Sequence, residues 1–152
     1  MRRHRLSRTL AGLLVLCALV APHTRAQAAL YPATAQAVVT TYLQALNDGM
    51  RQGDVSTVPP LYAPDATVTF STADGVTKVF RGRAAITRFY RHLLQMIPGF
   101  QWRQDHLRTL SPTVVLSYEH PVTPGQVVVG RCAHLFVLQD GQIESLDWVV
   151  YH

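Results

Sequence analysis

The sequence is poor in cysteine and has no acidic residue near its beginning. Two cysteines in 152 residues are too few for a miniprotein held together by disulfide bonds. The first 28 residues contain five of the 14 basic residues and no acid, so the formal net charge of +5 is concentrated there. The rest of the chain has nine basic residues against nine acids and no long basic run, which argues against nucleic acid as a partner.

A short apolar run follows the basic start of the chain. Residues 10–21 carry no charge, and Ala26-Gln27-Ala28 has the pattern of a signal-peptidase site. A helix over this run would rise about 18 Å, too little for the roughly 30 Å hydrocarbon core of a membrane. We therefore expect a signal peptide over 1–28, cleaved near Ala28, and a secreted or periplasmic domain over 29–152. An uncleaved membrane anchor is the alternative.

Hydrophobic periodicity predicts helices early in the chain and strands late. Amphipathic patterns predict a helix over 33–48, where Asn47-Asp48-Gly49 is a stop signal, a helix over 84–96, and a short helix that ends near Ala63. Alternation and turn residues predict strands over 66–71, 77–81, 100–110, 112–120, 126–138 and 142–151. This order favours an α+β fold, a cone-shaped, curved antiparallel sheet with about three helices packed on its concave face. We expect a cavity between the helices and the sheet.

Four stretches carry a family resemblance, in the family's order and spacing. They are AVVTTYLQALNDG (37–49), LYAPDATV (61–68), GRAAITRFY (82–90) and FVLQDGQI (136–143). The pattern resembles the nuclear transport factor 2-like superfamily, which includes the SnoaL-like polyketide cyclases and the ketosteroid isomerases. The resemblance covers nearly all of 35–150 and implies the fold above. It leaves the reaction open, because the superfamily contains isomerases, cyclases, hydrolases and proteins that only bind.

The ketosteroid isomerases offer a comparison residue by residue. Tyr42 matches the tyrosine that donates a hydrogen bond to the developing enolate, and Tyr62 and Tyr90 match the tyrosines behind it. If the three hydroxyls are linked by hydrogen bonds, Tyr42 becomes a stronger donor. The alternative is that the three tyrosines are core aromatic residues whose hydroxyls bond to local partners. The two acids of the isomerases correspond to Phe70 and Ala133 here, which cannot transfer protons. The resemblance therefore implies that steroid isomerisation is absent.

The same resemblance predicts which side chains of the strand 126–138 face the cavity. Ala133 holds the position of an inward-facing acid, so Arg131 would also face inward, paired with Glu119, Asp105 or a ligand carboxylate. The alternate side chains would form an apolar outer face: Cys132, His134 and Phe136. Since superfamily members often bind a second subunit there, we expect a homodimer through this face. No intrachain disulfide is possible after residue 28, where a single cysteine remains, and we expect that cysteine to be buried.

Two residues late in the chain are candidates for an acid or base. Trp148 is expected to point inward and Asp147 outward, although a shift of one residue would turn Asp147 into the cavity. His120 ends its strand at the mouth of the cone. The histidines lack metal-ligand spacing and the acids are scattered, so we expect neither a metal nor a cofactor.

Two functions follow as alternatives. The first is an exported, non-catalytic protein that binds a small apolar or amphipathic molecule, with Arg131 as its polar anchor. The cavity would be lined by Tyr42, Tyr62, Phe70, Tyr90, Trp102, Arg131 and Trp148. The second is an isomerase, cyclase or dehydratase that uses Tyr42 as oxyanion donor and Asp147 or His120 as acid and base.

Overall fold

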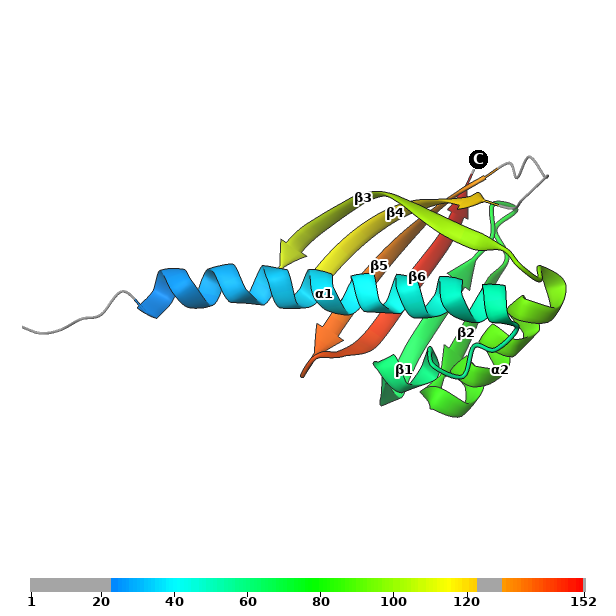
Figure 1. The fold of residues 1–152 in the computed structure, drawn as a ribbon, viewed down its shortest axis with the longest axis horizontal. Coiled ribbons are helices and arrows are strands. Elements are labelled where there is room, and N and C mark those ends of the chain that lie inside the picture. Colours follow the sequence, from blue (N-terminus) through cyan, green and yellow to red (C-terminus); the bar gives the residue numbers. More distant parts are fainter. Residues whose placement is uncertain (1–22, 123–129, 152) are drawn as a thin grey trace, which may run out of the picture.

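Helix α1 (His23–Gln52) lies across one face of a curved six-stranded sheet (Figure 1). The computed structural model describes residues 23–122 and 130–151. The strands are β1 (Tyr62–Ser71), β2 (Thr77–Arg81), β3 (Gln101–Ser111), β4 (Val114–Val122), β5 (Arg131–Gln139) and β6 (Gln142–Tyr151). Their order in the sheet is β2-β1-β6-β5-β4-β3. The α+β class is as predicted.

The sheet is not wholly antiparallel, and three helices were too many. Strands β1 and β6 pair in parallel, whereas every other neighbouring pair is antiparallel. The tight turns in the sequence predict only pairings between consecutive strands, and β1 and β6 are far apart in the chain. Helix α2 (Gly82–Met96) is the second α-helix, and the short helix is a single 3-10 turn, η1 (Pro59–Leu61). Pro59 and Pro60 occupy the first positions of η1, and because they lack an amide hydrogen the helix cannot begin earlier in the chain.

Helix α1 extends beyond the predicted range at both ends. It continues through Gly49 to Gln52 and is followed by Gly53, whose φ of 77° is the left-handed conformation that glycine adopts readily. The amide of Asp54 then donates a 2.9 Å hydrogen bond to the carbonyl of Gly49, which is the Schellman arrangement. Gly49 is needed for a different reason: a Cβ there would lie 2.6 Å from the carbonyl oxygen of Asp54.

Asn47 fastens helix α1 to the sheet. Its side-chain amide donates to the carbonyl of Trp102 at 2.8 Å and accepts from the amide of Trp102 at 2.7 Å. The backbone amide and carbonyl of Trp102, near the start of β3, are thus both hydrogen-bonded to the side chain of one helix residue. Asn47, which we interpreted as part of a helix stop, is instead a tertiary contact.

The predicted facing of β5 is wrong. Cys132, His134 and Phe136 are buried on the concave face, at most 5% exposed, whereas Arg131 is exposed on the other face. The error arose because the facing followed the family position of Ala133, and one residue of difference turns every side chain of a strand over. Cys132 is buried as expected, but in the core and not at a subunit interface.

The last strand has the predicted facing. Trp148 is 2% exposed and points into the core, and Asp147 is exposed on the outer face. Helix α2 covers the other end of the sheet, where it packs on β1 and β2 through Ile86, Phe89, Tyr90 and Leu93 (Figure 1). Side chains from both helices and the concave face together form one hydrophobic core.

The predicted leader lies largely outside the part of the chain that the structure describes, because residues 1–22 are not included. Within the described residues, no helix combines the length and the apolar character that a membrane crossing requires.

Candidate functional site

A polar cluster occupies the concave face beneath helix α1. It consists of Trp102, Glu119, Cys132, His134 and Trp148, which come from the four neighbouring strands β3, β4, β5 and β6. The strand register brings them together, because Glu119 pairs with Cys132 across β4 and β5 and His134 pairs with Trp148 across β5 and β6. We call these five residues the polar cluster.

The cluster contains a buried pair of ionisable side chains. Nδ1 of His134 lies 2.5 Å from Oε2 of Glu119, and both side chains are 0% exposed. The distance is that of an ion pair, but the angles are not those of a hydrogen bond, and Oε1 of Glu119 and Nε2 of His134 have no partner. Burying such groups is costly unless they are fully paired.

The two tryptophans add hydrogen-bond donors to the cluster. Nε1 of Trp102 and Nε1 of Trp148 are buried without a hydrogen-bond acceptor. Burial raises the pKa of the Cys132 thiol, and the two nearby indole N–H groups only partly offset that rise. Cys132 therefore remains a neutral thiol, a weak partner for the two indoles.

Three tyrosine hydroxyls form a chain beside the cluster. The hydroxyl of Tyr90 lies 2.9 Å from that of Tyr42 and 2.6 Å from that of Tyr62. Burial raises the pKa of all three tyrosines, and the neighbouring tyrosines raise those of Tyr42 and Tyr62 further. At ordinary pH they are thus neutral groups that can donate a hydrogen bond.

Tyr42 connects the hydroxyl chain to the polar cluster. Its ring packs edge-to-face with the imidazole of His134 at 6.4 Å between centroids, and with Phe136 at 5.2 Å. The charge of Glu119 also raises the pKa of both Tyr42 and Tyr90. A carboxylate, an imidazole and a tyrosine hydroxyl are therefore neighbours in a setting from which water is largely excluded.

The unpartnered polar atoms of the described residues are confined to this place. Four buried side-chain nitrogen and oxygen atoms have no polar partner: Nε1 of Trp102, Oε1 of Glu119, Nε2 of His134 and Nε1 of Trp148, all in the cluster. Oε2 of Glu119 and Nδ1 of His134 contact only each other. Each such atom ordinarily costs about 1–3 kcal/mol. A concentration of these costs in one place is typical of a site that holds water or a ligand.

Several side chains predicted for the site lie elsewhere. Arg131 is exposed on the outer face and is not a polar anchor of the interior. Asp147 is exposed on that face as well, so the sheet separates it from the buried Tyr42. His120 is also outside the core, with Nδ1 2.8 Å from a carboxylate oxygen of Asp105. Neither of the two predicted bases, Asp147 and His120, therefore lies beside Tyr42 in the structure.

The aromatic residues predicted to line the site do come together. Tyr42, Tyr62, Tyr90, Trp102 and Trp148 are buried, and Phe70 is partly buried. The ring of Phe70 packs against Trp148 at 5.4 Å, and that of Trp148 packs against His134 at 4.5 Å. The ring of Trp148 thus lies between the apolar end of the interior and the polar cluster.

Glu119 and His134 are the functional candidates that the sequence analysis placed wrongly or left as mere partners. The sequence of β5 holds no clear signal for them, because both alternations of the strand are largely apolar: Cys132, His134, Phe136 and Leu138 on one face, and Ala133, Leu135 and Val137 on the other.

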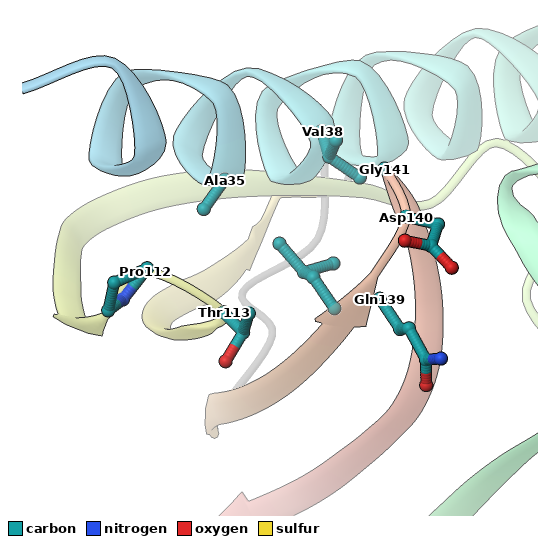
Figure 2. A pocket seen from close by; sticks show the side chains of 8 residues that line it. Ala35, Val38, Pro112, Thr113, Gln139, Asp140 and Gly141 are labelled. Atoms are coloured by element: carbon teal, nitrogen blue, oxygen red, sulfur yellow. The ribbon is translucent and has the colours of Figure 1, made fainter. Parts of the chain in front are cut away.

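Two surface hollows border the region under α1. The first, of about 290 Å³, lies between α1 and the turns that follow β3 and β5. Figure 2 shows Ala35 and Val38 of the helix on one side and Pro112, Thr113 and Asp140 on the other. The second, of about 390 Å³, lies between α1 and β3, and Trp102 and Asn47 are among its lining residues. This second hollow reaches a member of the polar cluster from outside.

No group of three or more His, Cys, Asp or Glu side chains in residues 23–122 and 130–151 is arranged to hold a metal ion. The side chains of the polar cluster can donate and accept hydrogen bonds and can transfer protons.

Solved structures share this fold. A phenazine biosynthesis-related protein from Pseudomonas aeruginosa superposes with a TM-score of 0.65 at 17% identity, over 83% of this chain and 84% of its own. An NTF2-like protein from Anabaena variabilis has a TM-score of 0.64 at 15% identity, over 78% and 90% of the two chains. A SnoaL-like protein of unknown function from Burkholderia thailandensis has a TM-score of 0.61 at 15% identity, over 79% and 97%. At such identities the similarity establishes the fold alone.

Sequence comparison gives a narrower result. No curated protein matches the chain. The model of the SnoaL-like domain matches residues 39–146, which include the C-terminal part of α1, all of α2 and the inward-facing residues of the polar cluster on β3, β4 and β5. Because this match covers more than half of the chain and agrees with the fold, the resemblance seen in the sequence is confirmed, and the protein belongs to the SnoaL-like domain family.

Proposed function

We propose that this protein binds a small, mostly apolar molecule between helix α1 and the concave face of the sheet. The aromatic side chains of the interior would contact its apolar body. The Glu119–His134 pair and the two indole N–H groups would bind a polar group at one end. Such a molecule would need both a hydrogen-bond acceptor for the indoles and a donor for the carboxylate, which a hydroxyl group supplies.

The observation that carries this proposal is that the four buried polar atoms without a partner, among the described residues, all lie in one cluster. A cluster with only a structural role would be expected to satisfy its own members. The surroundings of these atoms are apolar and aromatic, which is the usual composition of a pocket for a small molecule.

Binding of 2-naphthol tests the proposal, with naphthalene as the probe that lacks the polar group. We expect saturable binding of 2-naphthol, with amide NMR shifts that centre on Glu119, Cys132 and His134. The variant Glu119→Gln keeps the size of the side chain but removes its charge. It should weaken 2-naphthol binding about tenfold or more, as expected for a hydrogen bond to a charged group, and leave naphthalene binding nearly unchanged.

Glu144→Gln is the matched control, because Glu144 is an exposed glutamate on β6. It should bind both probes as the unaltered protein does. Equal losses in the two glutamate variants, or shifts confined to residues outside the interior, would contradict the proposal.

The contact between His134 and Glu119 favours a second function, acid–base catalysis. A carboxylate 2.5 Å from Nδ1 of an imidazole orients the ring, and Tyr42 lies beside it as a neutral donor. For a ketone, Nε2 of His134, whose ring is held by the contact between Nδ1 and Glu119, would accept a proton from the carbon next to the carbonyl group. The electrons of that C–H bond would then form an enolate, whose oxygen would accept a hydrogen bond from Tyr42.

Exchange of the methyl protons of 2-acetylnaphthalene in D₂O measures this reaction directly. An enzyme of this type should accelerate the exchange over buffer, and Glu119→Gln should lower the acceleration by about 10²–10⁴-fold. Glu144→Gln should retain it. Exchange at the buffer rate with bound ketone would leave binding as the function and exclude this proton transfer.

We further propose that the protein is exported and dimeric. The signal-peptide pattern supports export with cleavage near Ala28, and mass spectrometry of the protein recovered outside the cytoplasm tests both.

The outer face of the sheet supports the dimer, since its side chains are largely apolar: Val114, Leu116, Tyr118, Ala133, Leu135, Val137 and Val149. Leu135→Asp should convert a sedimenting dimer to a monomer, whereas Met96→Asp on α2 should not.

A further inference from the structure

A third hollow, of different chemistry, lies at the opposite end of the sheet from β3. It runs between β2, the edge strand, and helix α2 beside it (Figure 1), and encloses about 440 Å³. Its lining residues are Lys78, Val79 and Phe80 from β2 and Ala85, Arg88, Phe89 and His92 from α2. We call it the edge groove.

The sequence explains why this groove is cationic. No acid occurs between Asp74 and Asp105, although six of the nine basic residues after position 28 fall in that interval. They are Lys78, Arg81, Arg83, Arg88, Arg91 and Arg103. On α2, Ala85, Arg88 and His92 are spaced three and four residues apart and therefore share one face of the helix. The balanced charge of the domain thus conceals a strongly basic region.

The charges of the edge groove are available to a partner. Lys78, Arg88 and His92 are exposed, and none of them forms an ion pair with another described residue. The Arg83 side chain is different, because its Nε donates to the carbonyl of Tyr62 at 2.7 Å and so serves the fold.

The floor of the groove is aromatic. The rings of Phe80 and Phe89 lie 4.6 Å apart between centroids, with an angle of 33° between their planes. Val79 is 52% exposed at the rim. A ligand in this groove would meet positive charge on both walls and apolar surface beneath, a combination that suits an anion with an apolar body.

We propose that the edge groove binds an amphiphilic anion, a carboxylate or phosphate joined to an alkyl or aromatic group. The anionic group lies between Lys78 on one wall and Arg88 and His92 on the other. The planar guanidinium of Arg88 can bind two oxygens of either group at once. The apolar part rests on Phe80 and Phe89. Such an anion is supplied either free in solution or as the head of an anionic lipid in a bilayer.

Decanoate below its micelle concentration is the probe, and decyltrimethylammonium is the probe of opposite charge. Decanoate should shift the amides of residues 78–92, and the cation should not. The triple variant Lys78→Gln, Arg88→Gln, His92→Gln should bind decanoate about tenfold more weakly, as expected for the loss of two exposed charges and one histidine contact. The control Arg103→Gln, Arg108→Gln, Arg131→Gln removes three exposed basic side chains from other strands and should change the affinity less than twofold.

Sedimentation with vesicles separates the two sources of the anion. Binding to vesicles that contain phosphatidylglycerol, lost in the triple groove variant, would assign the groove to lipid head groups. Decanoate binding without vesicle binding would assign it to free anions. The proposal is overturned if neither decanoate nor the phosphatidylglycerol vesicles bind the protein, or if the groove variant and its control bind decanoate equally. The interior site is judged separately, because 2-naphthol shifts at Glu119 and His134 do not depend on this outcome.

Discussion

At the scale of single residues, the burial of Glu119 and His134 is the most consequential feature. Two ionisable side chains with no exposed surface are held against one another by strands β4 and β5. Removal of one partner leaves the other buried without compensation, whereas removal of both leaves apolar neighbours that can pack. Their contribution to stability is therefore conditional on each other.

This dependence leads to a prediction for a double-mutant cycle. Glu119→Leu and His134→Leu should each lower the free energy of unfolding by about 3–5 kcal/mol. The double variant should lose less than the sum of the two, because no unpaired group remains. Urea unfolding curves of the four proteins measure the coupling. Additive losses would show that the two side chains do not stabilise each other.

The tyrosine chain has an internal order that predicts unequal effects. Tyr90 bonds to both other hydroxyls, whereas Tyr62 is at the end of the chain. Tyr90→Phe leaves two buried hydroxyls without their partner and should cost about 1–3 kcal/mol, more than Tyr62→Phe. Tyr118→Phe, at an exposed tyrosine, should change stability by less than about 0.5 kcal/mol. Urea unfolding measures all three, and a smaller loss for Tyr90 than for Tyr62 would contradict the order.

At the scale of elements, the C-terminal end of α1 shows how a contact can overrule a helix signal. The turn-forming residues Asn47, Asp48 and Gly49 predicted a stop, yet the helix runs on to Gln52. Gly49 provides room for the returning backbone of Asp54, and Asn47 binds β3. Asn47 and Gly49 are required by contacts with β3 and with the chain that follows the helix. Local helix propensity does not include these contacts and therefore predicted the end of α1 wrongly.

Replacement of Gly49 therefore has an unusual expected sign. Glycine to alanine inside a helix ordinarily stabilises by about 0.5–1 kcal/mol. Gly49→Ala should instead destabilise by about 1–3 kcal/mol, because the new Cβ overlaps the carbonyl oxygen of Asp54. Gln44→Ala, at an exposed position of the same helix, should lie within about 0.5 kcal/mol of the unaltered protein. Thermal unfolding compares the two, and a stabilised Gly49→Ala variant would refute the close contact.

The strands illustrate the same division between local and distant information. Strand β2 begins and ends at the predicted residues, because the Asp74-Gly75 turn and the helix after it mark both limits. The predicted strand 126–138 starts within residues that the structure does not describe, and β5 is seen from Arg131 onward. Its facing could not follow from length and alternation alone, because both alternations were compatible with a strand.

At the scale of the whole molecule, the buried tyrosines make stability dependent on alkaline pH. Burial raises the pKa of Tyr42, Tyr62 and Tyr90 in the folded protein, whereas in the unfolded chain tyrosine ionises near pH 10. Their contribution is fully present below about pH 10. Above it the unfolded chain binds fewer protons than the folded one, so the folded state loses stability as pH rises towards the folded pKa values.

We expect the free energy of unfolding to fall by up to about 1.4 kcal/mol per pH unit for each of the three tyrosines. The Cys132 thiol, whose pKa burial also raises, acts in the same direction. Urea unfolding at intervals from pH 8 to pH 11.5 measures the slope. Tyr62→Phe should make it shallower, and a slope that is flat above pH 10 would contradict the burial of these hydroxyls.

The amino-acid sequence by itself determined the order of elements, the α+β class, the three tyrosines and the aromatic lining. These depend on periodicity, turn residues and motifs, all of which act over a few neighbouring residues. Only the tertiary structure decided which face of β5 is buried, and with it the pairing of His134 with Glu119. Either alternation of β5 could face the core. Which one does depends on the side chains that α1 and β4 bring into contact with the strand, because burial is determined by contacts between segments distant in the chain.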